Sequence, residues 1–435
     1  MNTSLVGRVR FLRAFHSRSF VLFWAGQTIS IIGNGAFTTA LAWQVFLLTH
    51  SATALGIILT AQTIPTLFFI LVGGITADRF PRRLLLLWSD AGRAVAVFLV
   101  TLLSWLQVLQ LWHLIALGLA FGIAGSFFYP AFRALPPQLV ASDDLPSANA
   151  LTELSIQAGM LLGPVVGALC LALGGATLAF GFDGLTFVIS VLSLAFIRLS
   201  PSMVQRAGRE RETHAPTAVP SEQRETARTG LVGVIAGIRE GMSYIRDSRW
   251  LLVTILVPAI GSFGSSAPIS VVLPKLIHDV YGAGVWLLGG FGTAVGLGWI
   301  GAAFFVGQVH LPRRGIVAFL AHSLASVALL ALGLAFPRGS EPTIALVAGV
   351  LYGFGVGTLQ TIWVTLLHEL VPNDKLGRVS SIDLLGTLSL APIAYLVAGS
   401  LADHFGPAWV FLAGGFLNLV LNGIALSLRD IRELA

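Results

Sequence analysis

Long apolar segments separated by short polar ones follow each other along almost the whole chain. A helix needs about 20 mostly apolar residues to cross the hydrocarbon core of a bilayer, and twelve segments reach that length. Their limits are Phe20–Leu48, Thr53–Ala77, Leu84–Val108, Trp112–Val140, Ser147–Leu173, Ala176–Leu199, Trp250–Leu276, Val285–Gln308, Ile316–Phe336, Thr343–Val371, Val379–Ala402 and Pro407–Leu428. Because these segments lack the alternation of strands, the pattern predicts an all-α membrane protein with twelve transmembrane helices.

The composition excludes a protein that is surrounded by water. Hydrophobic residues make up 55% of the 435 residues and charged residues 11%, against about 25% charged in an ordinary soluble domain. A soluble fold could not bury that much apolar surface. The 48 glycines fit packed membrane helices, in which small residues let backbones approach each other. A single cysteine, Cys170, excludes a disulfide framework.

Arginine and lysine residues indicate how the helices are oriented. When both termini are placed in the cytoplasm, 22 of the 26 basic residues lie on the cytoplasmic side, whereas Lys275 and Arg338 lie outside. Such a bias follows the positive-inside rule. We therefore expect a multi-pass protein of the cell (inner) membrane with both termini cytoplasmic. The same bias accounts for the basic net charge without a nucleic-acid partner.

One long polar stretch, Pro201–Ser248, divides the twelve spans six and six. Within it, Leu231–Ile245 has apolar residues at helical spacing. This spacing predicts an amphipathic helix on the cytoplasmic membrane surface or, alternatively, a helix that packs against the protein. The expected organisation is an N-terminal six-helix bundle over residues 1–199, a cytoplasmic linker over 200–249 and a C-terminal six-helix bundle over 250–435.

The two sets of six spans carry traces of a duplication. Pro81-Arg82-Arg83 recurs 231 residues later as Pro312-Arg313-Arg314, and Gly118 and Gly122 recur with the same offset. One ungapped offset that aligns loops and spans together predicts two parallel six-helix repeats. Pseudo-symmetric repeats of this kind are one plan of secondary transporters, whose substrate site lies between the halves near the bilayer midplane.

The loop between the second and third spans carries the most specific motif. Residues Gly73–Arg83 resemble the loop signature of the major facilitator superfamily, which runs Gly, three residues, Asp-Arg, one residue, Gly and two basic residues. Here Pro81 stands where the family usually has Gly. The resemblance implies the major facilitator fold. It also implies a gating role for five residues of this loop: Gly74, Asp78, Arg79, Arg82 and Arg83.

Asp78 is expected to act as a latch at the cytoplasmic gate. A carboxylate is stabilised by the free N–H groups at a helix N-terminus, and spans 2 and 11 of a two-repeat transporter meet at that gate. We expect Asp78 to bind the start of span 11 when the cytoplasmic side is closed, with Arg378 adding a charge-assisted contact. The second repeat has Val309 at the matching position, so this latch exists in one half only.

A glycine-rich element in span 5 resembles the Gly-x-x-x-Gly-Pro-x-x-Gly element of exporter branches of the superfamily. It is formed by Gly159, Gly163, Pro164 and Gly167. The glycines share one helix face, which allows close approach of a neighbouring helix, and the proline can bend the span. Plain helix packing is the alternative reading of this element.

Further segments are similar to one exporter branch in particular. Asn149-Ala150-Leu151 and Gly377-Arg378-Val379-Ser380-Ser381 resemble the branch that contains enterobactin-type siderophore exporters and macrolide efflux proteins. That resemblance implies export of small hydrophobic or amphipathic molecules of the drug, macrolide or siderophore type. The branch often has an acidic residue in the middle of span 1, where this chain has Asn34.

Ionisable residues inside the spans are the candidates for energy coupling, because it is costly to bury them there. These candidates are Glu153, Asp183, Asp383 and Arg133. Glu153 is slightly favoured, and a pair between Arg133 and Glu153 is plausible across the short loop that joins their spans. Asp90 and Arg93, three residues apart on span 3, are expected to satisfy each other.

Several polar and aromatic residues are candidates for lining a substrate cavity. They are Gln27, Asn34, Gln62, Gln157, Gln360, Trp43 and Trp363. For each of them, an interhelical hydrogen bond is the competing interpretation.

The motifs favour a secondary transporter over an enzyme. The chain has no Gly-x-x-x-x-Gly-Lys nucleotide-binding loop, so the energy is expected to come from an ion gradient, with protons as the default. No metal site or cofactor is expected. The expected partners are membrane lipid, a small-molecule substrate and protons, and the expected state is a monomer. An importer, or a receptor or scaffold on the same fold, stays an alternative.

Overall fold

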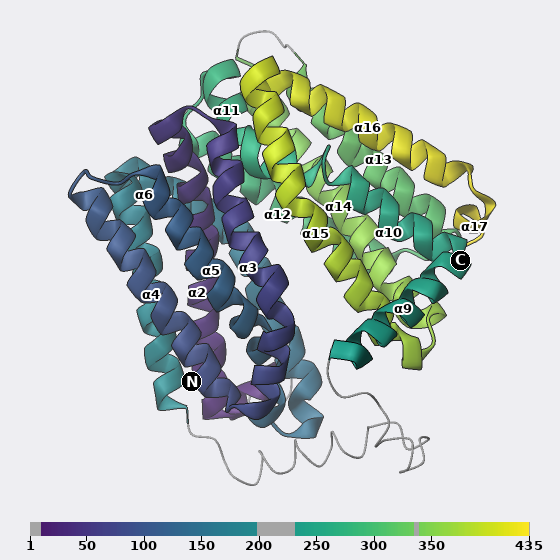
Figure 1. Cartoon of the computed structure of the whole chain (residues 1–435), viewed down its shortest axis with the longest axis horizontal. Coiled ribbons are helices and arrows are strands. Elements are labelled where there is room, and N and C mark those ends of the chain that lie inside the picture. The colour runs from purple at the N-terminus through teal and green to yellow at the C-terminus, as the bar shows by residue number, and fades with distance from the viewer. Residues whose placement is uncertain (1–9, 198–230, 335–338, 435) are drawn as a thin grey trace.

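The computed structural model describes residues 10–197, 231–334 and 339–434, and every regular element in these ranges is a helix (Figure 1). The side chains of residues 10, 70–75, 77–79, 231–238 and 373–374 lie outside the description. The expected flexible linker, Pro201–Thr229, also lies outside it.

The N-terminal group of helices accounts for the first six predicted spans. Its long helices are α2 (Arg18–Thr49), α3 (Ala52–Arg79), α4 (Arg82–Trp105), α5 (Leu111–Ala134) and α6 (Leu145–Phe196), with short turns η1 (Arg10–His16), η2 (Pro136–Gln138) and η3 (Ser142–Asp144). Two predicted spans fall within α6, which is interrupted at Gly174 and Gly175 by non-helical backbone angles. Gly175 has φ +66°, a conformation that glycine adopts without the cost a Cβ would add.

The C-terminal group accounts for the other six spans. Its elements are α9 (Leu231–Asp247), α10 (Arg249–Gly261), η4 (Pro268–Val272), α11 (Leu273–Lys275), η5 (Leu276–Val280), α12 (Val285–Gln308), α13 (Arg314–Gly333), α14 (Glu341–Leu370), α15 (Asn373–Phe405), α16 (Pro407–Ser427) and α17 (Arg429–Arg432). The predicted span Trp250–Leu276 is not one continuous helix. It breaks after Gly261 and resumes as the π-helical η4.

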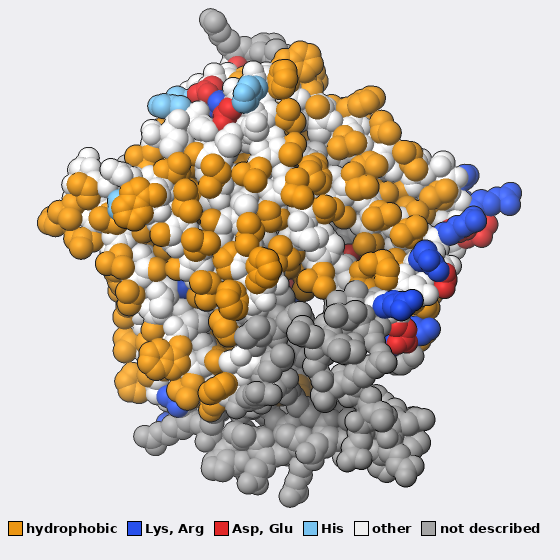
Figure 2. Space-filling view, in the orientation of Figure 1, with side chains coloured by type: hydrophobic (Ala, Val, Ile, Leu, Met, Phe, Trp, Pro, Cys, Tyr) orange, Lys and Arg blue, Asp and Glu red, His pale blue; other side chains and the backbone are white. Residues whose placement is uncertain are grey.

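Ten helices in the described part of the chain are long and apolar enough to cross a membrane. Since α6 contains two spans and the segment from α10 to η5 supplies a broken one, the twelve-span prediction is confirmed. Figure 2 shows hydrophobic side chains covering the middle of the molecule, while the charged side chains lie towards its ends. Large apolar side chains such as Phe68, Trp88 and Phe304 are more than 70% exposed, as expected for a surface that contacts lipid.

The two groups repeat the same helix packing. A Cβ added to Gly118 of α5 would lie 2.9 Å from the carbonyl oxygen of Ile58 in α3, and one added to Gly349 of α14 would lie 3.1 Å from that of Phe291 in α12. Helices α5 and α14 therefore approach α3 and α12 through glycines at equivalent positions. This contact, made twice, supports the duplication that the constant offset of 231 residues indicates.

The two groups converge at one end of the molecule and diverge at the other (Figure 1). We call the end that holds the N-terminus and α9 the terminal face, and the opposite end, near His50 and Phe405, the distal face. Between the groups, α3 contacts α15 and α6 contacts α12. Thr60 donates a hydrogen bond to the Pro392 carbonyl at 3.2 Å, and Thr293 to the Leu161 carbonyl at 2.8 Å. These contacts leave a space between the groups.

Candidate functional site

A cavity of about 680 Å³ lies between the two groups of helices. The N-terminal group contributes Asn34, Phe37, Thr38, Gln62, Met160 and Pro164 to its lining, and the C-terminal group contributes Ser270, Phe291, Trp299, Tyr352 and Tyr395. Among the described residues that line it, none carries a charged side chain. The cavity therefore offers aromatic faces together with hydroxyl and amide groups. Such a surface suits an apolar or amphipathic molecule of drug size.

Two of the candidate lining residues, Asn34 and Gln62, line this cavity. The other glutamines lie elsewhere. Gln27 is buried inside the N-terminal group, Gln157 donates to Glu153 at 3.1 Å, and Gln360 is exposed.

The two candidate tryptophans are also outside the lining. Trp43 is buried and its ring centroid lies 6.1 Å from that of His278. Trp363 is buried against Trp250, and its indole N–H donates to Asp383 at 3.1 Å. Asp383 and Trp363 are thus brought together, as a link between α14 and α15. In contrast, the aromatic lining residue Trp299 carries no sequence signal that separates it from a lipid-facing tryptophan.

The glycine-rich element of span 5 contacts both groups. Gly159, Gly163 and Gly167 face α2, and a Cβ added to Gly163 would lie 2.7 Å from the Cα of Gly35. Pro164 faces the other way, towards α12, where a Cβ on Gly292 would lie 2.7 Å from the proline ring. The element therefore packs α6 tightly on α2 and places Pro164 where the two groups touch.

A buried cluster of charges lies inside the N-terminal group. Asp90 and Arg93 of α4 form the expected ion pair, and Asp90 also accepts hydrogen bonds from Ser190 at 2.6 Å and Gln27 at 3.2 Å. The Arg93 guanidinium lies over the ring of Phe128, 4.2 Å from its centroid. We call Asp90, Arg93 and the nearby Asp183 of α6 the charge cluster. The exposed fractions of the three residues are 0%, 6% and 0%.

Asp183 is the least satisfied member of the charge cluster. Its Oδ1 accepts a long hydrogen bond from Thr186, at 3.4 Å, and its Oδ2 has no partner among the described residues. A Cβ on Gly33 of α2 would lie 2.9 Å from Oδ1. Because Asn34 follows Gly33 and lines the cavity, Asp183 sits directly behind the cavity wall.

The other ionisable candidates are more exposed. Glu153 and Arg133 both lie on the surface, and no ion pair joins them in the described structure. The expected pair does not form because both side chains are exposed and point away from the helix packing, and η2 and η3 separate the end of α5 from the start of α6. Asp383 is half-buried on α15.

Two arginines of the loop motif tie helix ends together within the N-terminal group. Arg82 donates to the Ala134 carbonyl at the end of α5, at 2.5 Å, and Arg83 donates to the Leu194 and Ala195 carbonyls at the end of α6, both at 2.6 Å. Cations are stabilised at helix C-termini, where carbonyl groups lack partners. The side chains of Asp78 and Arg79, and the surroundings of Gly74, lie outside the described residues.

Helix α9 packs on the start of α15. Arg378 forms an ion pair with Glu240, the Lys375 ammonium lies 4.6 Å from the Tyr244 ring centroid, and Ile245 is buried. The last turns of the amphipathic helix therefore pack against the protein.

The two groups also contact each other at the distal face, through a residue that was not predicted as part of a site. The Asp403 carboxylate of α15 accepts hydrogen bonds from Ser51 and Thr53 at the start of α3 and from Lys275 of α11. The signal was available, because Ala402-Asp403-His404-Phe405 is similar to Ala77-Asp78-Arg79-Phe80 of the loop motif.

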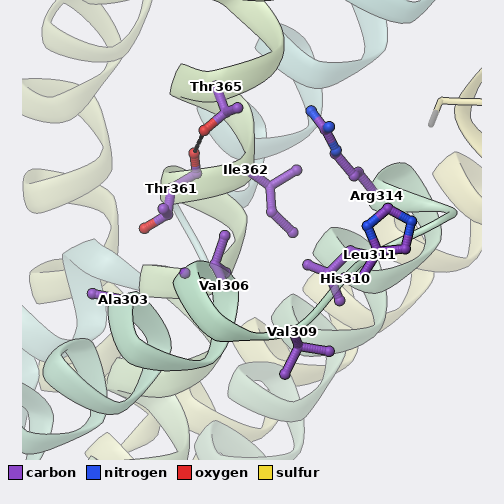
Figure 3. A pocket seen from close by; sticks show the side chains of 10 residues that line it. Ala303, Val306, Val309, His310, Leu311, Arg314, Thr361, Ile362 and Thr365 are labelled. Carbon is purple, nitrogen blue, oxygen red and sulfur yellow. Dashed lines mark hydrogen bonds between the residues drawn. The ribbon is translucent and has the colours of Figure 1, made fainter.

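A second pocket, of about 350 Å³, lies within the C-terminal group at the terminal face (Figure 3). Val306 and Ile362 form apolar walls, and Arg314 extends over the pocket and pairs with Glu369 at 2.5 Å. Because this pocket touches only one group of helices, the cavity between the groups is the better candidate for a substrate site.

Two repeated groups of transmembrane helices around a central cavity define the class of secondary transporters. A family model described as Major Facilitator Superfamily matches residues 23–391. The chain therefore belongs to the major facilitator superfamily, which confirms the resemblance seen in the loop motif, and it is a multi-pass membrane transporter.

Two characterised relatives are exporters. The multidrug efflux pump Tap of Mycobacterium tuberculosis (strain ATCC 25618 / H37Rv) is 27% identical over 433 residues, which cover 96% of this chain and 94% of that protein. The enterobactin exporter EntS of Escherichia coli (strain K12 / MC4100 / BW2952) is 25% identical over 424 residues, covering 95% and 94%. Among solved structures, a bacterial homologue of the iron transporter ferroportin in an inward-facing state has a TM-score of 0.68 at 16% identity, covering 94% of this chain and 99% of that one.

Proposed function

We propose that the protein exports small hydrophobic or amphipathic molecules by alternating access. The central cavity carries this proposal, because its described lining residues combine aromatic rings with hydroxyl and amide groups and include no charged side chain. A pocket of this kind binds molecules of varied shape through apolar contact. Both characterised relatives are exporters, and the drug type fits the uncharged lining better than an anionic siderophore, which would need a cation in the site.

The orientation follows from the charges. With the terminal face in the cytoplasm of a cell (inner) membrane, the positive-inside rule is satisfied. The groups then diverge towards the cytoplasm and touch at the external face. This arrangement corresponds to the inward-facing state of a transport cycle, in which the cavity takes up its substrate from the cytoplasmic side.

The charge cluster is the proposed site of proton coupling. The cluster holds two carboxylates and one guanidinium, which pairs with Asp90, so it keeps a net negative charge unless one carboxylate takes up a proton. An uncompensated charge at such a site is very costly. Asp90 accepts hydrogen bonds from three donors, whereas Asp183 has one weak donor and an oxygen without a partner among the described residues. Asp183 therefore replaces Glu153 as the favoured proton carrier.

An efflux screen tests the function. Cells that overexpress the protein are loaded with a panel of neutral, cationic and anionic compounds, and their retention is measured with and without a protonophore. We expect lower retention of neutral or cationic amphipathic compounds, and we expect the protonophore to abolish the difference. Net accumulation would indicate an importer, and unchanged retention of the whole panel in cells and in proteoliposomes would indicate a receptor or scaffold.

A further inference from the structure

Asp403, near the end of α15, is surrounded by donors from both groups of helices. Its Oδ1 accepts from the Ala52 N–H at 3.0 Å and the Lys275 ammonium at 2.6 Å. Its Oδ2 accepts from the Ser51 hydroxyl at 2.6 Å, and from the Thr53 N–H and hydroxyl at 3.0 and 2.7 Å. Only 14% of the Lys275 side chain and 19% of the Asp403 side chain are exposed, so the contact is largely shielded from water.

The chemistry of this contact is that of a helix cap supplied by another helix. Ala52 and Thr53 are the first residues of α3, and their N–H groups have no partner within that helix. The positive end of the helix dipole favours a carboxylate there. Lys275 adds a charge-assisted bond. Since Asp403 and Lys275 belong to the C-terminal group and α3 to the N-terminal group, the contact holds the groups together at the distal face.

The same seven-residue pattern ends both helices of this contact. Helix α3 ends with Gly74-Ile75-Thr76-Ala77-Asp78-Arg79-Phe80 and α15 ends with Gly399-Ser400-Leu401-Ala402-Asp403-His404-Phe405. Gly, Ala, Asp and Phe occupy the same places in both. Each helix thus carries a carboxylate near its C-terminal end, and the two ends lie at opposite faces of the molecule.

Helices α3 and α15 run antiparallel, so their pairing can be followed from one face to the other. Thr53 lies opposite Asp403, and Thr60 lies opposite Pro392. When the same register is continued, position 78 of α3 falls opposite residues 374–378, in the first turns of α15. At that end of α3 the two groups of helices diverge in this structure. At the distal face, the start of α3 and the end of α15 are in contact.

We propose that Asp403 is an external latch, which holds the two groups of helices together at the distal face and opens when the cavity faces the outside. The inference rests on the proposed transport cycle. In the inward-facing state the Asp403 carboxylate caps α3. In the outward-facing state this cap is broken. The Asp403 latch stabilises the inward-facing state because its two halves meet only in that state.

External labelling of a cysteine in the cavity tests this assignment. The reporter is Thr38→Cys in a Cys170→Ser background, treated with a membrane-impermeant thiol reagent on intact cells. Asp403→Asn should raise the labelling rate about tenfold, since a capped carboxylate in a partly buried site biases such an equilibrium by about that factor. The matched control is Asp279→Asn, which removes an acid from the same face that pairs only with its neighbour His278.

Thr53→Val provides a second variant, because it removes one donor and keeps the size of the side chain. It should raise labelling in the same direction as Asp403→Asn, and by less. If both variants label at the rate of Asp279→Asn, Asp403 is not a latch. The labelling needs no substrate, so a protein that exports none of the tested compounds still reports the latch. Efflux together with unchanged labelling would support the proposed export function and contradict the assignment of Asp403 as a latch.

Discussion

At the scale of single residues, the two carboxylates of the charge cluster differ in the number of hydrogen bonds that they accept. Asp90 and Asp183 are both fully buried beside one arginine. Asp90 accepts hydrogen bonds from Gln27, Ser190 and Arg93, whereas Asp183 accepts one long hydrogen bond, from Thr186. The proposed proton carrier, Asp183, is therefore the less satisfied of the two carboxylates.

Asp183→Asn is the first test of this assignment. We expect the variant to lose uphill efflux driven by a pH gradient in proteoliposomes, while exchange of substrate down its own gradient persists, because the amide imitates the protonated acid permanently. Glu153→Gln should behave like the unmodified protein, since Glu153 is exposed. The assignment fails if Asp183→Asn still drives uphill efflux, or if Glu153→Gln is the variant that loses it.

Gly163 gives a second prediction at this scale. A methyl group there would meet the Gly35 backbone, so Gly163→Ala should destabilise the protein by about 1–3 kcal/mol, as overpacking does. Gly423→Ala is the control, since a Cβ at that position meets nothing within 4 Å, and alanine is the better helix former. Thermal unfolding in detergent should show a lower Tm for Gly163→Ala only. Equal Tm values would show that α2 and α6 can separate slightly at no cost.

Residue type allowed part of the site to be predicted from the sequence. A polar residue within a span faces either another helix or a cavity, and the sequence does not distinguish the two. Asn34 and Gln62 line the cavity, whereas Gln27 turns inward to Asp90. The aromatic lining residues were missed because their residue types are equally common on surfaces that face lipid.

At the scale of elements, the arginines at the start of α4 connect three helices. Arg83→Gln should lower the free energy of unfolding by about 1–2 kcal/mol, because the hydrogen bonds from its charged group to the Leu194 and Ala195 carbonyls are lost. Arg313→Gln is the control, as Arg313 is exposed at the start of α13. Chemical or thermal unfolding of the two purified variants compares them. If both lose the same stability, the Arg83 contacts contribute nothing measurable.

The spans themselves followed from the sequence because length and apolar composition alone decide whether a helix can cross a bilayer. The break between α10 and η4 could not be predicted from the sequence. It depends on the backbone between Gly261 and Pro268, where the chain leaves the α-helical pattern within a span that is long and apolar enough to be predicted as one continuous helix. The packing of α9 depends on its partner α15, and amphipathic spacing by itself does not separate a protein surface from a membrane surface.

At the scale of the whole molecule, the proposed orientation can be tested without any substrate. In the Cys170→Ser background, Val108→Cys lies between α4 and α5 at the distal face and Glu433→Cys follows α17 at the C-terminus, and both positions are exposed. An impermeant thiol reagent on intact cells should label Val108→Cys and spare Glu433→Cys until the membrane is permeabilised. The reverse order of labelling would invert the proposed topology.

The charge cluster also sets a limit on how far a substrate can be concentrated. If the proposed coupling at Asp183 holds, two acids and one arginine leave room for a single exchangeable proton, which would correspond to one proton for each molecule exported. A difference of one pH unit supplies about 1.4 kcal/mol, enough for about a tenfold gradient of a neutral compound. Because that exchange moves one net charge, each 100 mV of membrane potential adds about 2.3 kcal/mol, or roughly fiftyfold more. A compound that carries one positive charge cancels this second contribution, so its export would depend on the pH difference alone and would be insensitive to voltage.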